Sequence, residues 1–140
     1  MARTNLPLTT LSPNGAVLNN AGTAIDAANG MTIALPSNAI PASPDAEQLL
    51  LYVQNTFAGT KTVIVRAGTS NPPAFRGGLG DFTSGNLTAS TGTAFIGPFE
   101  AARYIQTDGS INVDFAASMT GTIWAVRLPR YVSGSSVTGG

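Results

Sequence analysis

Residues 48–55 read Gln-Leu-Leu-Leu-Tyr-Val-Gln-Asn, and their centre is an unbroken apolar run. In an extended chain this run places three aliphatic side chains on one face and Leu50 and Tyr52 on the other, because successive side chains alternate. Both faces of the strand are therefore apolar. We expect a central strand that is covered on both sides or that lies at an interface.

The segments on either side of this stretch also indicate strands. Residues 60–66 are rich in β-branched side chains and follow a turn at Ala58-Gly59, so they predict a hairpin with residues 48–55 and a loop of about four residues. Residues 31–35 carry apolar side chains at every second position, which is the period of a strand. The proline-containing stretch that follows them predicts a loop.

The second half of the chain continues the same pattern. Residues 93–99 predict a short strand. Residues 103–107 and 110–115 flank Asp108-Gly109, a pair that is typical of two-residue hairpin turns, and they predict a second hairpin. Residues 122–128 predict the last strand. Between these pairs, residues 67–80 form a long, turn-rich loop, and long ordered loops are often functional.

No helical period emerges, and about seven to nine short strands with regularly spaced turns predict an all-β, single-domain sandwich or barrel. We divide the chain into an extended N-terminal arm with short strands (1–30), a sandwich or barrel core (31–130) and a flexible Ser/Gly tail (131–140). Pro7 and Pro13 favour extended geometry in the arm. Such an arm either lies on a partner or wraps its own domain, and the sequence leaves both open.

Charge is sparse: only 10% of the residues are charged, against about 25% in ordinary soluble domains. The seven basic and seven acidic residues balance, and the basic ones are scattered, so we expect no binding to nucleic acid. A neutral, charge-poor surface suits packing against other proteins, although a plain polar surface fits as well. No stretch approaches the roughly 18 apolar residues of a membrane span, and no secretory signal opens the chain, so we expect no membrane partner and no classical export.

The sequence contains no histidine and no cysteine. This excludes Ser-His-Asp catalysis, cysteine nucleophiles, disulfide bonds and metal sites built on His or Cys. The carboxylates are better explained by positions in turns and on solvent-exposed strand faces than by catalysis. Residues 77–81 resemble a phosphate-binding loop only in their glycines, because the Lys-Ser/Thr ending is missing. We therefore predict no catalytic residue, no metal and no cofactor, and a protein that is not an enzyme.

Two segments carry a resemblance to a known family. Residues 95–113, Phe-Ile-Gly-Pro-Phe-Glu-Ala-Ala-Arg-Tyr-Ile-Gln-Thr-Asp-Gly-Ser-Ile-Asn-Val, and residues 71–81, Asn-Pro-Pro-Ala-Phe-Arg-Gly-Gly-Leu-Gly-Asp, look like small head proteins of tailed bacteriophages, especially phages of actinobacteria. Asn14-Gly15 and residues 21–26 add to this resemblance, which covers most of residues 8–130.

The resemblance implies a capsid decoration (cement) protein, a structural virion component made in the host cytoplasm. Such proteins bind the outer surface of an expanded capsid and stabilise the shell. The implied partner is a major capsid protein of the HK97 type, and the implied assembly is a homo-oligomer, with a trimer favoured. No functional residue set carries over from the family.

Four residues are candidates for contact with the capsid or between subunits. Leu6 and Leu8 are apolar side chains in the arm, and Phe75 and Arg76 belong to types that are enriched at interfaces. Phe75 is equally well explained as an anchor of its own loop.

Two other functions remain open. One is a tail-tube or head–tail connector protein, which would assemble into rings or tubes. The other is a receptor-binding or carbohydrate-binding sandwich that uses exposed aromatic side chains: Trp124, Tyr52, Tyr104 and Tyr131. For Trp124 and Tyr52, which lie in predicted strands, we expect packing in the core instead.

Overall fold

The computed structural model of the chain describes residues 2–11, 14–18, 20–35, 48–69 and 76–128. Within these ranges the chain forms ten short strands, one helical turn and one 3-10 turn. In chain order they are β1 (Thr4–Asn5), β2 (Leu8–Thr10), β3 (Thr23–Ala24), β4 (Met31–Ala34), β5 (Leu49–Asn55), β6 (Val63–Val65), η2 (Gly77–Leu79), β7 (Phe82–Thr83), β8 (Thr93–Ile96), α1 (Ala101–Tyr104), β9 (Ser110–Phe115) and β10 (Gly121–Arg127).

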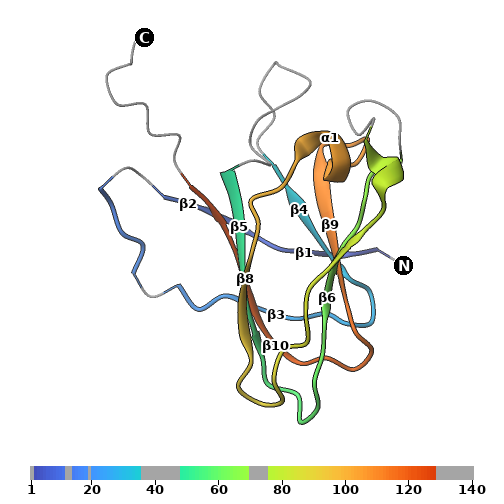
Figure 1. Ribbon diagram of the computed structural model, residues 1–140. Helices are drawn as coiled ribbons and strands as arrows, with labels where there is room; N and C mark the ends of the chain where they lie inside the picture. Colours follow the sequence, from blue (N-terminus) through green and yellow to red (C-terminus); the bar gives the residue numbers. More distant parts are fainter. Residues whose placement is uncertain (1, 12–13, 19, 36–47, 70–75, 129–140) are drawn as a thin grey trace.

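The strands form two mixed sheets. Sheet A has the order β1-β4-β9-β6-β7, and sheet B has the order β2-β10-β5-β8, with β3 also paired to β10. The prediction of an all-β fold is confirmed. Neither sheet closes on itself, so the architecture is sandwich-like rather than a barrel. Figure 1 shows β5, β8 and β10 in one layer and β4, β6 and β9 in the other. Ten strands exceed the expected seven to nine because several have only two residues.

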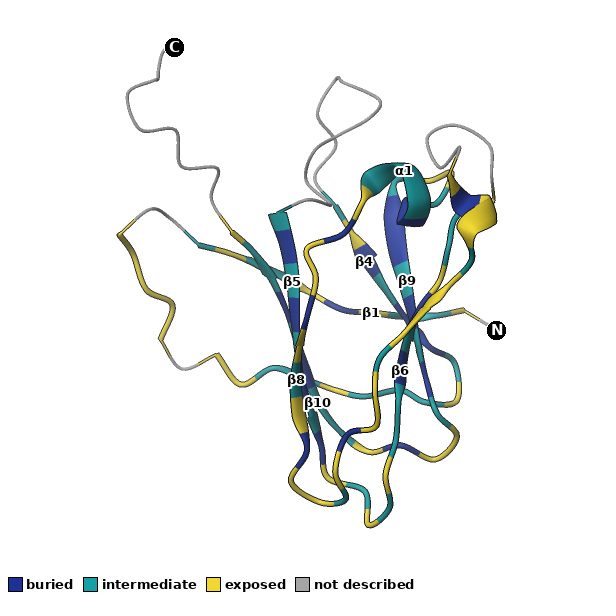
Figure 2. Cartoon of the chain, viewed as in Figure 1, coloured by how far each residue is buried: buried dark blue, intermediate teal, exposed yellow. Residues whose placement is uncertain are grey.

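The core lies between the two sheets and follows the alternation of the strands. In β5 every second residue from Leu49 to Asn55 is buried, and the residues between them are half-buried (Figure 2). In β9, Ile111, Val113 and Phe115 are buried in the same way. The alternation of apolar side chains thus sets which face of each strand forms the core.

The N-terminal segment joins both sheets. β1 pairs in parallel with β4 in sheet A, and β2 pairs in parallel with β10 in sheet B. Leu6 lies between these two strands and is only 1% exposed, as a member of the core cluster. Of the two alternatives left open by the sequence, residues 4–10 therefore take the one in which the segment wraps its own domain.

The predicted hairpin of residues 48–55 with 60–66 is wrong. β5 lies in sheet B between β10 and β8, whereas β6 lies in sheet A between β9 and β7. The chain crosses between the sheets around the buried Asn55, whose side-chain amide donates to the carbonyls of Gly59 and Thr88 and whose oxygen accepts from the backbone N–H of Phe57. This crossing lets both strands place an apolar face on the same core.

The predicted hairpin around Asp108-Gly109 is only partly right. The turn exists: the N–H of Gly109 donates to the carbonyl of Gln106, and the Asp108 carboxylate accepts from the N–H and the hydroxyl of Ser110. The strand on its N-terminal side is absent, because residues Ala101–Tyr104 form the helical turn α1 instead. This turn buries Tyr104, with its ring 5.7 Å from that of Phe99.

Candidate functional site

The outer face of sheet A carries a network of ion pairs. Asp114, on β9, accepts from Arg3 at 2.5 Å and from Nε of Arg66 at 2.5 Å. Arg66 also donates to Asp81 at 2.6 Å, and the same carboxylate accepts from the N–H of Ala67. The network ties the start of the chain to β9 and to the strands at the far edge of the sheet.

The network keeps its carboxylates ionised. Burial opposes the charged form of Asp114, but the hydrogen bonds from Arg3 and Arg66 outweigh it and lower its pKa. For Asp81 burial again opposes ionisation, and the hydrogen bonds from the Ala67 N–H and from Arg66 lower the pKa below its usual value. The arginines of the network are bound to carboxylates of the same domain, so the arrangement is one of structural anchoring.

The outer face of sheet B is different and carries a row of aromatic rings. Phe95 on β8, Tyr52 on β5 and Trp124 on β10 are directly paired across the sheet. The ring of Tyr52 lies 4.8 Å from that of Phe95 and 5.2 Å from that of Trp124. Phe95 is 72% exposed. The prediction that Tyr52 and Trp124 pack in the core is wrong, because both sit on the outward side of their strands and are half-buried.

The register of the sheet explains the close approach of Tyr52 and Phe95. The N–H of Asn55 donates to the carbonyl of Gly92, so hydrogen-bonded pairs between β5 and β8 recur at every second residue from there. Tyr52 and Phe95 fall between them, in a non-hydrogen-bonded pair, where side chains approach most closely. The aromatic contact follows from the ladder itself.

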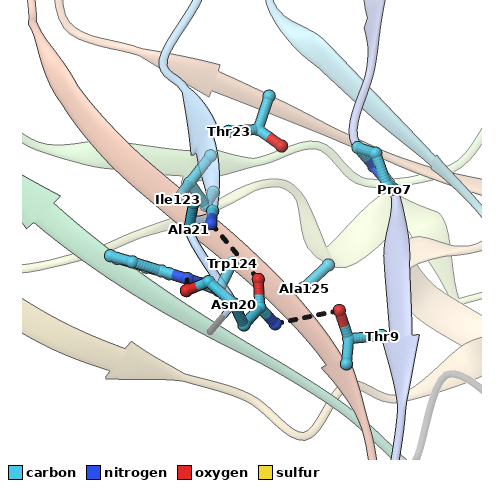
Figure 3. Close-up of a pocket in the computed structure, with 9 residues that line it drawn as sticks. Pro7, Thr9, Asn20, Ala21, Thr23, Ile123, Trp124 and Ala125 are labelled. Atoms are coloured by element: carbon cyan, nitrogen blue, oxygen red, sulfur yellow. Dashed lines mark hydrogen bonds between the residues drawn. The ribbon is translucent and has the colours of Figure 1, made fainter. Parts of the chain in front are cut away.

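A hollow of about 260 Å³ lies beside Trp124 at the other edge of sheet B, between β2 and the segment that leads into β3 (Figure 3). Asn20 spans it: its amide donates to Thr9, its side-chain oxygen accepts from the N–H of Gly22, and its carbonyl accepts from Nε1 of Trp124 at 2.9 Å. Both oxygens of Asn20, one N–H of its amide and the indole N–H of Trp124 are therefore already used. These hydrogen bonds fasten the segment to the sheet, and few polar groups in the hollow remain for a ligand.

A second exposed surface lies at one end of the sandwich, and we call it the loop end (residues 76–81 and 100–104). The N–H of Arg76 donates to the carbonyl of Ala102, and its guanidinium forms an ion pair with Glu100. Arg103 donates to the carbonyl of Gly80 at 2.9 Å. These contacts hold η2 against α1, so the described parts of residues 71–81 and 95–113 meet here. Leu79 projects from η2 and is 58% exposed.

The four interface candidates lie in different places. Leu6 belongs to the core, and Leu8 packs against it, so both have partners within their own domain. Arg76 is exposed at the loop end, and Phe75 lies outside the described residues. The exposed apolar residues Leu79 and Phe95 were not among the candidates. The exposure of Phe95 could have been predicted in part from the sequence. Phe95 and Ile96 are adjacent in a predicted strand, so one of them must face outward.

Comparison with known protein families, curated proteins and solved structures finds no match to this chain. The described residues contain no group of three or more acidic side chains placed to hold a metal ion. Nor do they include a helix long and apolar enough to cross a membrane.

Proposed function

We propose that this chain is a non-enzymatic structural protein of a phage virion, which binds the outer surface of an expanded capsid and stabilises the shell. The observation that carries the proposal is the meeting of the two phage-like segments at the loop end, where an apolar side chain is presented to solvent on a braced turn. The neutral, charge-poor composition is consistent with a protein that works packed against others.

The loop end has the features of a recognition surface. Leu79 sits on a short 3-10 turn that is held at both ends: the N–H of Arg76 donates to the carbonyl of Ala102, and Arg103 donates to the carbonyl of Gly80. Little conformational freedom is therefore lost on binding. Arg76 beside it is exposed and oriented by Glu100. Arginine is enriched at protein interfaces, and the buried centre of an interface is more apolar than the rest of the surface.

Stabilisation of the shell follows from mass action. A protein that binds only the expanded lattice lowers the free energy of that state by an amount that grows with the occupancy of its sites. The contacts at each site are ordinary recognition contacts, and the many identical sites of a capsid multiply their effect. No chemistry is required of the chain.

The test is binding of variants to expanded capsids prepared without this protein. Leu79→Lys should weaken binding at least tenfold, because it places a charge in the apolar contact. Leu18→Lys is the matched control, since Leu18 is equally apolar, more exposed and far from the loop end in sequence. Equal binding by both variants, with both folded, would contradict the assignment of the loop end.

The aromatic row favours one second candidate, a carbohydrate-binding or receptor-binding module. An exposed Phe95 beside Tyr52 offers an apolar ring face of the kind that sugars stack on. Titration with oligosaccharides, followed through the fluorescence of Trp124, the single tryptophan, tests it. A saturable change that Phe95→Ala abolishes would favour this candidate over the capsid protein.

A further inference from the structure

Sheets A and B end in edge strands that differ in how well they are protected against pairing with a strand of another chain. β1 and β7 have two residues each and lie beside the charged side chains of Arg3 and Asp81. β2 has three residues, and Asn20 reaches its Thr9. β8 is the longest edge, with four residues, and no charged residue occurs between Asp81 and Glu100. Natural proteins usually guard an edge of this kind with charges, proline or a bulge.

The backbone of β8 has a free side that can be assigned from the register. The hydrogen bond from Asn55 to Gly92 sets the phase of the β5–β8 ladder, so Ala94 and Ile96 direct their N–H and C=O groups toward β5. Thr93 and Phe95 direct theirs away from the sheet. No hydrogen bond among the described residues uses the outward groups of these two residues.

The side chains around this free edge are also uncharged. Phe95 stands on the outer face directly at the edge and is 72% exposed. The other outward-facing residues within β5, β8 and β10 are apolar or neutral: Leu50, Tyr52, Gln54, Thr93, Thr122, Trp124 and Val126. Two such edges can meet, with their outer faces side by side, without repulsion between like charges on the outward side chains.

We propose that β8 pairs with β8 of a second copy of this chain, antiparallel and about a two-fold axis, so that the two B sheets become one. The outward groups of Thr93 then pair with those of Phe95 of the second copy, and the reverse, which satisfies both residues. Ala94 faces Ala94 of the second copy across the axis, in a non-hydrogen-bonded pair. Phe95 is thereby brought against the neighbouring sheet and loses much of its exposure.

This association does not depend on the role in a capsid, and it differs from the trimer that the phage resemblance implies. Sedimentation equilibrium of the purified chain distinguishes them. We expect a concentration-dependent equilibrium between one and two copies, weakened at least tenfold by Phe95→Lys. Thr93→Pro should weaken it similarly, because it removes an outward N–H and leaves the ladder to β5 intact. A monomer at every concentration, a trimer, or a dimer that both variants leave unchanged would overturn the proposal.

The register is tested by a single cysteine, because the chain has none of its own. Ala94→Cys should form a disulfide-linked dimer under mild oxidation, since facing residues of a non-hydrogen-bonded pair lie within disulfide reach. Thr83→Cys, on the edge strand β7, is the matched control and should remain largely unlinked. Equal crosslinking at both positions, or none at position 94 in a protein that melts as the parent does, would contradict the pairing.

Discussion

The guanidinium of Arg3 donates to both carboxylate oxygens of Asp114, at 2.5 and 3.2 Å. Residues 3 and 114 lie far apart in the sequence, and their contact fixes the first strand against the outer face of sheet A. The Asp114 side chain is 20% exposed, so this pair is less screened by solvent than an ordinary surface ion pair. The start of the chain is therefore held by charge on one side and by the burial of Leu6 on the other.

Asp114→Asn should lower the free energy of unfolding by about 1–2 kcal/mol, because charge-assisted hydrogen bonds from two arginines are weakened together. Urea denaturation followed by circular dichroism measures this loss. Glu100→Gln is the control: Glu100 is 42% exposed and pairs with one arginine, so its loss should cost about 0.5 kcal/mol or less. Equal effects of the two substitutions would contradict the anchoring role of Asp114.

Stability should fall in acid. The folded-state pKa is lowered for Asp26 by hydrogen bonds from Thr4 and Asn29, and for Asp108 by those from Ser110. For Asp81 and Asp114 burial opposes ionisation, but hydrogen bonds lower the pKa of both: from the Ala67 N–H and Arg66 to Asp81, and from Arg3 and Arg66 to Asp114. A lowered pKa means that the stabilisation is complete above the unfolded value, near 4, and is lost as the pH falls through the folded value. Thermal melts should be flat between about pH 5 and 7 and should drop below about pH 4. A melting temperature that rises in acid would refute this.

Leu6→Ala should destabilise the domain by about 2–4 kcal/mol, because it removes a side chain that is 1% exposed between the sheets. Leu18→Ala, at a leucine that is 79% exposed, should change stability by less than about 0.5 kcal/mol. Chemical denaturation of both variants makes the comparison. If Leu6→Ala is as harmless as Leu18→Ala, the N-terminal segment is not part of the folded core.

Gly22→Ala should release the segment that is packed on Trp124. A Cβ at position 22 would lie 2.6 Å from Cε2 of Trp124 and 2.5 Å from Cγ2 of Thr122, and the backbone φ of +75° is also unfavourable for alanine. Fluorescence of the single tryptophan should shift to longer wavelength as the indole gains solvent. Gly85→Ala, with no atom within 4 Å of its Cβ, should leave the spectrum unchanged. An unshifted spectrum in Gly22→Ala would contradict the packing.

The sequence predicted the strands well where apolar alternation was strong. β4, β5, β9 and β10 lie within two residues of the expected bounds, because an alternating strand with one buried face leaves little freedom of register. The pairing of strands was predicted less well. Residues 48–55 and 60–66 are close in sequence, and nothing in their composition reveals that Asn55 supports a crossing between sheets. Similarly, Ala101–Tyr104 forms a helical turn because its contacts with η2 and Phe99 outweigh a weak local preference for a strand.

The candidate surfaces were harder to predict. In the sequence, Leu6 and Leu8 look available for contact with a partner. Their burial depends on β1 and β2 pairing with different sheets, which only the tertiary structure shows. Arg76 was proposed as an interface residue because arginine in a glycine-rich loop is a recognisable signal, and the structure shows it exposed. The sequence around Leu79, three residues further on, does not indicate an exposed leucine. Its exposure depends on the 3-10 turn, which directs the side chain outward.

Our proposal that this chain binds an expanded phage capsid is tested by co-sedimentation with capsids prepared without it. The number of copies bound per capsid should reach a plateau that corresponds to a fixed number at each equivalent lattice position. Unexpanded shells should bind little. Absence of binding to expanded capsids, or equal binding to both forms of the shell, would contradict a role in stabilising the mature particle.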